Sequence, residues 1–274
     1  MPRELPNGNK SRLGMTVAVK GLAMERGNGT KNGAAPACVK SPACAKGRHP
    51  CPLLALPMFA RLPKDRWQRF LDLVTVHTYE KGNILFYQGN QPLGLFFICS
   101  GRVKLLKEGR FGHNQIVRIA QAPDLVGDRS FFSQSAYAAT GEVMEEEATI
   151  CFLETRHFWD ILGQDAETLR NLVQRFAKEL GRAERIIHCL ASCTVRERSA
   201  AELLRVRDEA KTNEFELHES RTEFAQIIGT TPEAVSRSLA EFTDKGWVKV
   251  DGRQIRVLDE ARLRQIACPH PVSE

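Results

Sequence analysis

The sequence predicts an α+β fold in which a small β-roll, or jelly roll, precedes a long helix and a winged helix-turn-helix. Three observations carry this prediction: short alternating strands with regular turns between 75 and 120, an apolar helical stripe over 166–193, and two short helices followed by a hairpin over 221–257. We expect an N-terminal arm at 1–52, the β-roll at 53–163, the long helix at 164–193 and the winged helix at 194–274.

Composition places the chain among ordinary globular proteins. Its 274 residues are 42% hydrophobic and 26% charged, enough for two modest domains with real cores. No apolar run approaches the roughly 20 residues that a membrane span needs, and no secretory segment opens the chain. We therefore expect no membrane contact and a cytoplasmic location. The net charge is +6, and nine Lys/Arg against two Asp/Glu lie within residues 1–50, so basic charge elsewhere must be local.

Residues 1–35 are rich in Gly, Asn and Lys and lack an apolar period, which predicts a disordered basic arm. Three thiols then follow within fourteen residues, at Cys38, Cys44 and Cys51, in a Pro- and Gly-rich loop with no core of its own. The chain has eight cysteines. In a reducing cytoplasm metal binding, redox chemistry or burial accounts for them better than disulfides do.

The β-roll is expected after a short helix at 64–73. Segments 75–79, 84–87, 95–99, 102–106 and 115–120 carry β-branched and aromatic residues. Turn residues such as Gly82, Gly89 and Gly101 separate them. Short strands at this spacing are typical of a small barrel or jelly roll.

The long helix carries an apolar stripe whose members step by three or four residues. Such a stripe can pack on its own domain and can also hold a second copy of the chain, on different parts of the face. Thr194 and Glu197 then form a capping box that starts a new helix, so we expect a hinge near Thr194. The stripe consists of Leu169, Leu172, Phe176, Leu180, Ala183, Ile187 and Leu190.

Two short helices meet at Gly229, which can adopt positive φ in the turn between them. Thr231 is a side-chain N-cap, Pro232 fits the first turn of the second helix, and Gly246 ends it. The spacing of Ala225, Gly229 and Val235 is typical of a helix-turn-helix, and an ordinary αα-corner is the alternative. Apolar stripes of helical period support both helices: Phe224, Ile227 and Ile228, then Val235, Leu239 and Phe242.

Glu233, Ser236 and Arg237 leave the second helix from one side, near its N-terminus. A helix in the major groove reads bases from this end, where Arg suits guanine and Glu suits the amino group of cytosine. The alternative is a solvated face with an incidental salt bridge.

The segment 247–257 reads as two alternating strands around an Asp251-Gly252 turn, a basic hairpin whose Lys249, Arg253 and Arg256 can follow a phosphate backbone. A helix-turn-helix followed by such a hairpin is a winged helix, which predicts DNA binding. The DNA-contacting set that we predict is Thr231, Glu233, Ser236, Arg237, Lys249 and Arg253.

The β-roll has a specific resemblance. The run Lys81-Gly82-x-x-Leu85-Phe86-x-x-Gly89, followed by Leu95-Phe-Phe-Ile98-x-Ser100-Gly101-x-Val103-Lys104, resembles the cyclic-nucleotide-binding roll. Joined to a winged helix, it resembles the CRP/FNR superfamily of bacterial transcription regulators over residues 53–265. The resemblance implies a homodimer built on the long helix, double-stranded DNA with a palindromic site, and RNA polymerase as a partner. The dimer residues that we predict are Leu172, Phe176, Leu180 and Ile187.

Within this superfamily the sequence resembles the FNR branch. Where cAMP-binding members carry an arginine for the cyclic phosphate this chain has Gln134, although Asp128 could serve the ribose, so we do not expect cAMP binding. The turn at 124–127 and the Glu233-x-x-Ser236-Arg237 pattern are similar to FNR, whose helices read a site resembling TTGAT-N4-ATCAA.

FNR carries an oxygen-labile [4Fe–4S] cluster, and the resemblance implies Cys38, Cys44, Cys51 and Cys151 as its ligands here. This chain has five and six residues between its first three cysteines, whereas FNR separates its first two by two, so another cluster, zinc or a redox dithiol stays open. The predicted function is a transcription regulator that senses oxygen, redox state or nitric oxide. The alternative is a regulator without a metal, responding to another small molecule or to thiol oxidation.

The remaining cysteines have weaker patterns. Cys99 is expected as a buried thiol, Cys189 and Cys193 share a helix face and are assigned to packing, and Cys268 is expected in a frayed tail. A stand-alone nucleotide-sensing module would explain only the roll. No Gly-rich phosphate loop, nucleophile elbow or ligand-spaced histidine pair is present in the sequence, so we predict no enzyme.

Overall fold

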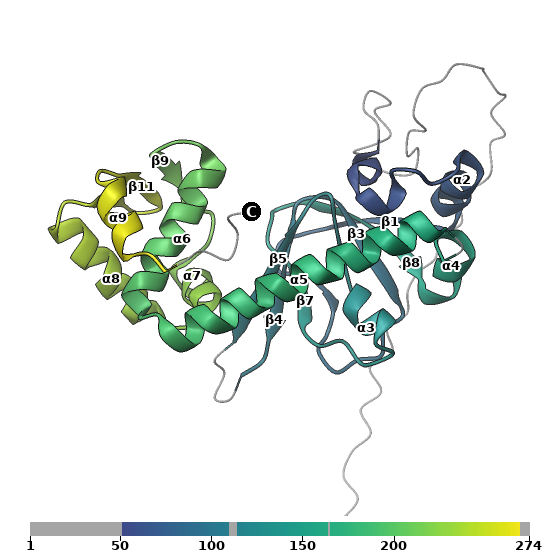
Figure 1. Cartoon of the computed structure of the whole chain (residues 1–274), viewed down its shortest axis with the longest axis horizontal. Coiled ribbons are helices and arrows are strands. Elements are labelled where there is room, and N and C mark those ends of the chain that lie inside the picture. Colours follow the sequence, from purple (N-terminus) through teal and green to yellow (C-terminus); the bar gives the residue numbers. More distant parts are fainter. Residues whose placement is uncertain (1–50, 110–113, 164, 269–274) are drawn as a thin grey trace, which may run out of the picture. The chain divides into compact units, whose positions relative to one another are not determined.

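The structure is a computed structural model that describes residues 51–109, 114–163 and 165–268. Strands gather in the first half of these residues, and the long helix α5 leads to a second group of helices with a small sheet (Figure 1). The predicted α+β class, with its roll, long helix and winged helix, is confirmed. Residues 1–50 of the predicted arm, with Cys38 and Cys44, lie outside the described residues, whereas Cys51 is buried and Pro52 begins the first short helix.

The roll consists of two antiparallel sheets of four strands each. Their facing sides enclose an apolar core that includes Ile98, Val103 and Ile150. One sheet has the order β1(Thr75–Tyr79), β8(Ala148–Glu154), β3(Gly94–Ser100), β6(Asp124–Val126), and the other the order β2(Ile84–Phe86), β7(Thr140–Val143), β4(Arg102–Lys107), β5(Gln115–Gln121).

A second core covers the outer side of β3 and β8. It is formed by the short helices η1(Pro52–Ala55) and η2(Pro57–Phe59) together with α2(Lys64–Leu73) and α4(Thr155–Ile161). Aromatic rings dominate it: Phe59 lies 5.1 Å from Trp67 and Phe70 lies 5.2 Å from Phe97, measured between ring centroids. Since both faces of β3 are covered, its first six residues are buried.

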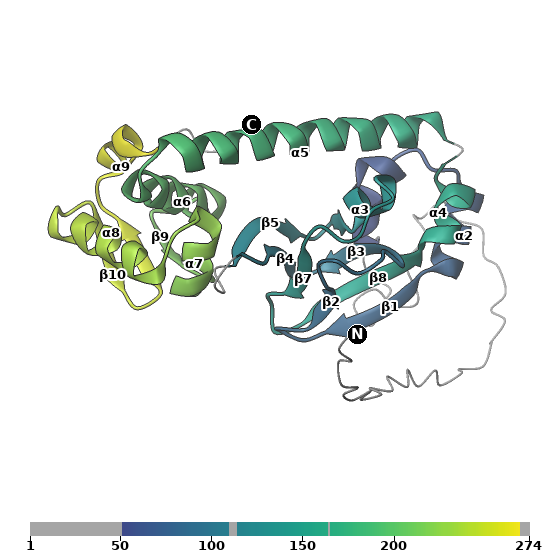
Figure 2. The same ribbon diagram turned by 90° about the horizontal axis from the view of Figure 1, so that it is seen from below.

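Helix α5 (Ala166–Ser192) begins at Asp165, whose side chain accepts a hydrogen bond from the Thr168 N–H at 2.6 Å. It lies along one side of the roll and ends beside α6 (Figure 2). Arg175 forms an ion pair with Asp124 at 2.8 Å. The ring of Phe176 packs edge to face against Phe132 of α3 (Asp128–Phe132). The first half of α5 is therefore anchored to the roll.

The predicted dimer residues of α5 fall into two groups. Leu172 is only 3% exposed and belongs to the core of its own roll, and Phe176 also packs on its own chain. Three apolar side chains spaced by seven residues point away instead: Val173 (67% exposed), Leu180 (61%) and Ile187 (65%). The exposed seam thus contains Leu180 and Ile187 but has Val173 in the place that the sequence analysis gave to Leu172.

The winged helix surrounds its own core, in which Phe224, Val235, Phe242 and Ile255 are buried. Its three strands pair in the order β10-β11-β9. The elements are α6(Val195–Ala210), β9(Glu214–Glu216), α7(Arg221–Ile228), α8(Pro232–Asp244), β10(Val248–Asp251), β11(Gln254–Val257) and α9(Glu260–Ile266).

Two features of the structure, the position of Cys268 and the strand β9, differ from the sequence analysis. Cys268 follows α9 and is not in a frayed tail: it is buried against Cys189, Cys193 and Ala201. The strand β9, which the sequence analysis did not predict, pairs with β11. Within the described ranges no helix is both long and apolar enough to cross a membrane.

Candidate DNA interface and thiol cluster

The helix-turn-helix is formed by α7 and α8. Ser220 and Glu223 make a capping box at the start of α7, and Gly229 ends that helix with φ of +66°. Thr231 then caps α8, its side chain accepting a hydrogen bond from the Ala234 N–H. Val235 is fully buried where the two helices meet. Capping at the helix ends and the buried Val235 side chain therefore stabilise the turn between α7 and α8.

The outer face of α8 presents Glu233, Ser236 and Arg237, all of them exposed. The Ser236 hydroxyl donates to the Pro232 carbonyl at 2.9 Å, which leaves its oxygen lone pairs available as acceptors. The pKa of Glu233 is lowered by its own backbone N–H, then by the Thr231 hydroxyl and by the charge of Arg237. The face offers one carboxylate, one hydroxyl and one guanidinium, which are groups that read base edges.

The wing is the β10-β11 hairpin, whose turn has Gly252 at φ of +58°. Lys249 and Arg253 are exposed on it, as predicted for phosphate contacts. Arg256 is also exposed, but it pairs with Glu214 of β9 through two hydrogen bonds of 2.9 and 3.0 Å, so a contact with phosphate would compete with this surface ion pair. Thr231 also serves the fold, as the N-cap of α8.

Charged side chains of the roll hold the start of α7. Arg102 Nη1 donates to Glu219 Oε1 at 2.7 Å, and Lys104 Nζ bonds Glu223 Oε1 at 2.9 Å. Lys104 also pairs with Glu142 of β7 at 2.9 Å. The sequence analysis did not predict this contact between β4 and the helix-turn-helix. Lys104 and Glu223 are 119 positions apart, and no local sequence pattern links them.

Glu223→Gln is expected to make the free energy of unfolding less sensitive to acid. Burial alone would raise the pKa of Glu223, but hydrogen bonds from Lys104 and Ser220 outweigh it and hold the pKa below its ordinary value of 4.5. Such a carboxylate stabilises the fold above the pKa of the unfolded chain, and this contribution is lost as pH falls through the folded pKa. Glutamine can keep the capping box through its one oxygen, and it removes the charge together with the oxygen that accepts from Lys104.

Denaturant titrations between about pH 6 and about pH 3 measure this effect. Wild-type protein should lose more stability over that range than Glu223→Gln. The exposed Glu147→Gln serves as control and should follow the wild type. Parallel curves for all three proteins would contradict the prediction.

The turn that corresponds to a nucleotide site is occupied by an internal ion pair. Asp128 is buried, and its carboxylate accepts a hydrogen bond from Arg175 of α5 at 3.2 Å. Gln134, the residue where an arginine would hold a phosphate, is exposed in the left-handed region with φ of +51°. Asp128, the acid that could have bound a ribose, is thus already paired with Arg175 of the long helix.

Three buried cysteines belong to the core beneath the short N-terminal helices: Cys51, Cys99 and Cys151. The sulfur atoms of Cys99 and Cys151 lie 3.1 Å apart, in the adjacent strands β3 and β8. Two of the four predicted metal ligands, Cys51 and Cys151, therefore share one core. The expectation of a buried Cys99 is met, and its proximity to Cys151 is new.

Two family profiles match the chain. Residues 76–165 match the cyclic nucleotide-binding domain, and residues 197–266 match the Crp-like helix-turn-helix domain. The two matches cover the roll and the winged helix, with α5 between them.

Several transcription regulators are similar to this chain. The chain is 26% identical over 193 residues to the transcriptional activator protein anr of Pseudomonas aeruginosa, which covers 69% of this chain and 78% of that protein. It is 24% identical to a CRP-like cAMP-activated global transcriptional regulator of Mycobacterium tuberculosis, over 69% and 86% of the two chains. Among solved structures, FixK2 from Bradyrhizobium japonicum superposes with a TM-score of 0.63 at 24% identity, over 72% and 98% of the chains.

Proposed function

The chain belongs to the CRP/FNR superfamily of transcription regulators, and from this premise we propose that it binds a two-fold DNA site as a homodimer and senses oxygen, nitric oxide or redox state through an iron–sulfur cluster. It is a DNA-binding regulator and not an enzyme. The observation that carries the proposal is the exposed Glu233, Ser236 and Arg237 face at the start of α8.

On DNA, this face enters the major groove while Lys249 and Arg253 of the wing lie against phosphates. Two copies related by a two-fold axis read two half-sites, so the preferred DNA is a palindrome resembling TTGAT-N4-ATCAA. RNA polymerase is the partner through which the regulator acts in the cytoplasm.

The dimer forms along the exposed seam of α5, defined by Val173, Leu180 and Ile187. These positions repeat every seven residues, and Ala183 and Leu190 follow three residues after Leu180 and Ile187. Such a spacing places apolar side chains on one line of a helix, as in a coiled coil. Exposed apolar side chains in a line are typical of a surface that a partner covers.

The buried thiols of the roll support a cluster. Thiolates are the ligands that iron–sulfur clusters use, and Cys51 and Cys151 supply two of the four from one core. Cys38 and Cys44 would complete the set and lie outside the described residues. The cluster would supply a redox-sensitive group and the free energy that orders the loop around it.

A route from this core to the dimer helix is present in the hydrogen bonds of η2, which follows shortly after Cys51. The Thr168 hydroxyl of α5 donates to the Met58 carbonyl at 3.0 Å, and the Asn171 amide donates to the Pro57 carbonyl at 2.9 Å. A change at Cys51 can therefore reach the first turns of α5 through the short stretch of chain from Cys51 to η2 and these two hydrogen bonds. We expect cluster loss to loosen α5 and weaken binding to two half-sites.

Protein purified without air is expected to be brown and to contain about four iron and four sulfide per chain. Cys151→Ser should abolish the cluster because it removes a ligand that the core holds in place. Cys193→Ala, at the far end of α5, serves as control and should retain the iron. Iron and sulfide analysis, absorption spectra and DNA binding before and after exposure to air measure the outcome. A colourless, iron-free protein that binds DNA equally in both conditions would remove the cluster from the proposal.

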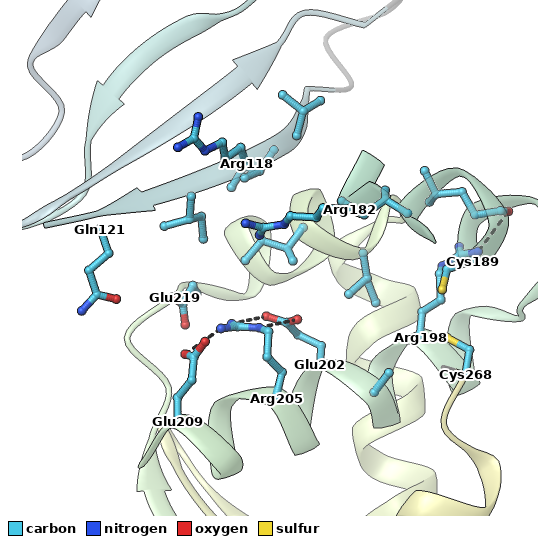
Figure 3. Close-up of a pocket in the computed structure, with 18 of the residues that line it drawn as sticks. Arg118, Gln121, Arg182, Cys189, Arg198, Glu202, Arg205, Glu209, Glu219 and Cys268 are labelled. Atoms are coloured by element: carbon cyan, nitrogen blue, oxygen red, sulfur yellow. Dashed lines mark hydrogen bonds and ion pairs between the residues drawn. The ribbon is translucent and has the colours of Figure 1, made fainter. Parts of the chain in front are cut away.

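A second candidate signal is a small anionic effector. A cavity of about 190 Å³ lies between β5, α5 and α6, with Arg118, Arg182 and Arg205 among its lining residues (Figure 3). Glu202 holds Arg205 at 2.5 Å, and burial followed by the charges of Arg118 and Arg205 lowers the pKa of Arg182. Arg118 and Arg205 are already paired with carboxylates, whereas the buried Nε of Arg182 has no hydrogen-bond partner among the described residues, so Arg182 is the group that favours an anion. An iron-free anaerobic protein would favour this effector over the cluster as the signal.

A further inference from the structure

Three cysteines gather where the dimer helix meets the winged helix. Cys189 lies in the last turn of α5, Cys193 is the C-cap of that helix, and Cys268 follows α9. Their sulfur atoms all lie within 4.8 Å of one another. Cys189 and Cys268 are buried and also line the cavity of Figure 3, and Cys193 is half-buried.

The spacing of these sulfur atoms is close to that of a metal–thiolate site. Zinc–sulfur bonds of about 2.3 Å in tetrahedral geometry place two sulfur atoms roughly 3.8 Å apart. The three thiols therefore need to close by at most about 1 Å, which side-chain rotation at Cys193 and the short segment after α9 can provide.

The surroundings suit a site of modest negative charge. Arg198 lies at the cluster, its Nη1 donating to the Cys193 carbonyl at 2.8 Å and its Nη2 to the Gly229 carbonyl at 3.4 Å. Three thiolates on Zn²⁺ carry a net charge of −1, which this guanidinium balances. Three thiolates on Cu⁺ would carry −2, so the single arginine favours zinc.

We propose that Cys189, Cys193 and Cys268 bind one zinc ion as three thiolates at the junction of the dimer helix and the winged helix. Each thiol releases its proton to solvent when the metal binds, and the fourth zinc position is left for water or an added ligand, as in zinc sites with three protein ligands. The alternative, three small thiols used only for packing, explains their burial but gives no reason for three sulfur atoms to converge from two distant segments.

Such a site would connect two parts of the molecule across a hinge. Thr194 is the N-cap of α6 directly after Cys193, and Cys268 follows α9, the last helix of the winged helix, by two residues. A zinc ion would fix the end of α5 to both, which would restrict the orientation of α8 relative to the seam. The site is at the opposite end of α5 from the roll thiols and does not depend on the iron–sulfur proposal.

The proposal is tested by measuring zinc binding to the full-length chain that carries Cys38→Ser and Cys44→Ser. These substitutions remove two N-terminal thiols that would compete for the zinc. After chelator treatment, one zinc ion per chain should bind in competition with a chromophoric chelator, and Co²⁺ should give the thiolate charge-transfer absorption of a sulfur-rich site. Zinc should raise the Tm of this protein. Cys268→Ala and Cys193→Ala should each weaken zinc binding at least tenfold, whereas Cys99→Ala, at a buried thiol of the roll, should leave it unchanged.

Three results would overturn the proposal. The first is unchanged zinc affinity in the Cys189→Ala/Cys193→Ala/Cys268→Ala variant. The second is a Cys189–Cys268 disulfide, seen by mass spectrometry, that forms with dissolved oxygen as oxidant in place of metal binding. The third is one Cu⁺ ion bound in preference to zinc at matched free concentrations. Cys193→Ala, at the half-buried position, keeps the test decisive if the triple variant fails to fold.

Discussion

Leu180→Asp is expected to convert the dimer into a monomer. Leu180 is 61% exposed in one chain and stands between Val173 and Ile187 in the seam of α5. Burying such a side chain contributes about 1.5–3 kcal/mol, and each dimer contains two copies, so the dimer dissociation constant should rise by roughly two to four orders of magnitude. Desolvation of the two carboxylates adds to this effect.

Light scattering or sedimentation at micromolar concentration measures the oligomeric state. Lys178→Asp is the control for charge, since it places a carboxylate on an exposed position of the same helix two residues, or about 200° of rotation, from Leu180. It changes the net charge by −2 against −1 for Leu180→Asp, and it should stay dimeric. DNA binding should follow, because a monomer engages one half-site and loses the gain in effective concentration from the second. A dimeric Leu180→Asp would show that the two chains meet through another surface.

The parts of the fold that could be predicted are those that local chemistry fixes. Gly229, Thr231 and Gly246 mark the ends of α7 and α8 through backbone conformation and capping, and these signals lie within a few residues of the elements that they end. The hairpin turn at Gly252 is of the same kind. Burial of the inward face of α8 then follows from its helical period, which leaves Glu233 and Arg237 outside.

Long-range pairing was the part that could not be predicted. Leu172 and Val173 are adjacent and both apolar, and only the packing of α5 on the roll decides which of them is exposed. Arg256 looks like any basic wing residue until β9 brings Glu214 beside it. Cys268 lies 75 residues from Cys193, and no periodicity in the sequence links the two.

The cysteines of the candidate sensor could also be predicted only in part. Residue type and resemblance placed Cys151 among the ligands, and the structure places it with Cys51 in one core. The 3.1 Å approach of Cys99 to Cys151 arises from the pairing of β3 with β8, whose register shifts between Ile98 and Ser100, and the two cysteines are 52 positions apart. A strand register of this kind depends on both sheets of the roll and has no local signature.

Arg237→Ala is expected to weaken binding to the palindrome and to relax its sequence preference. Arg237 is exposed at the start of α8, and the charge of this residue helps to lower the pKa of Glu233 beside it. A bidentate arginine–guanine contact contributes about 1–3 kcal/mol of discrimination, so affinity for the cognate site should fall roughly 5- to 150-fold per contact, whereas affinity for random DNA should change little.

Two controls separate base reading from charge. Arg237→Lys keeps the charge and loses the two parallel donors, so it should still lack the preference for guanine while its affinity for random DNA stays that of the wild type. Lys249→Ala in the wing should weaken binding to all sequences alike and reduce the dependence of affinity on salt by about one ion per half-site. Fluorescence anisotropy with the palindrome, a guanine-substituted site and random DNA at several salt concentrations distinguishes these patterns. If Arg237→Ala retained both affinity and sequence preference, α8 would not read the major groove through this face.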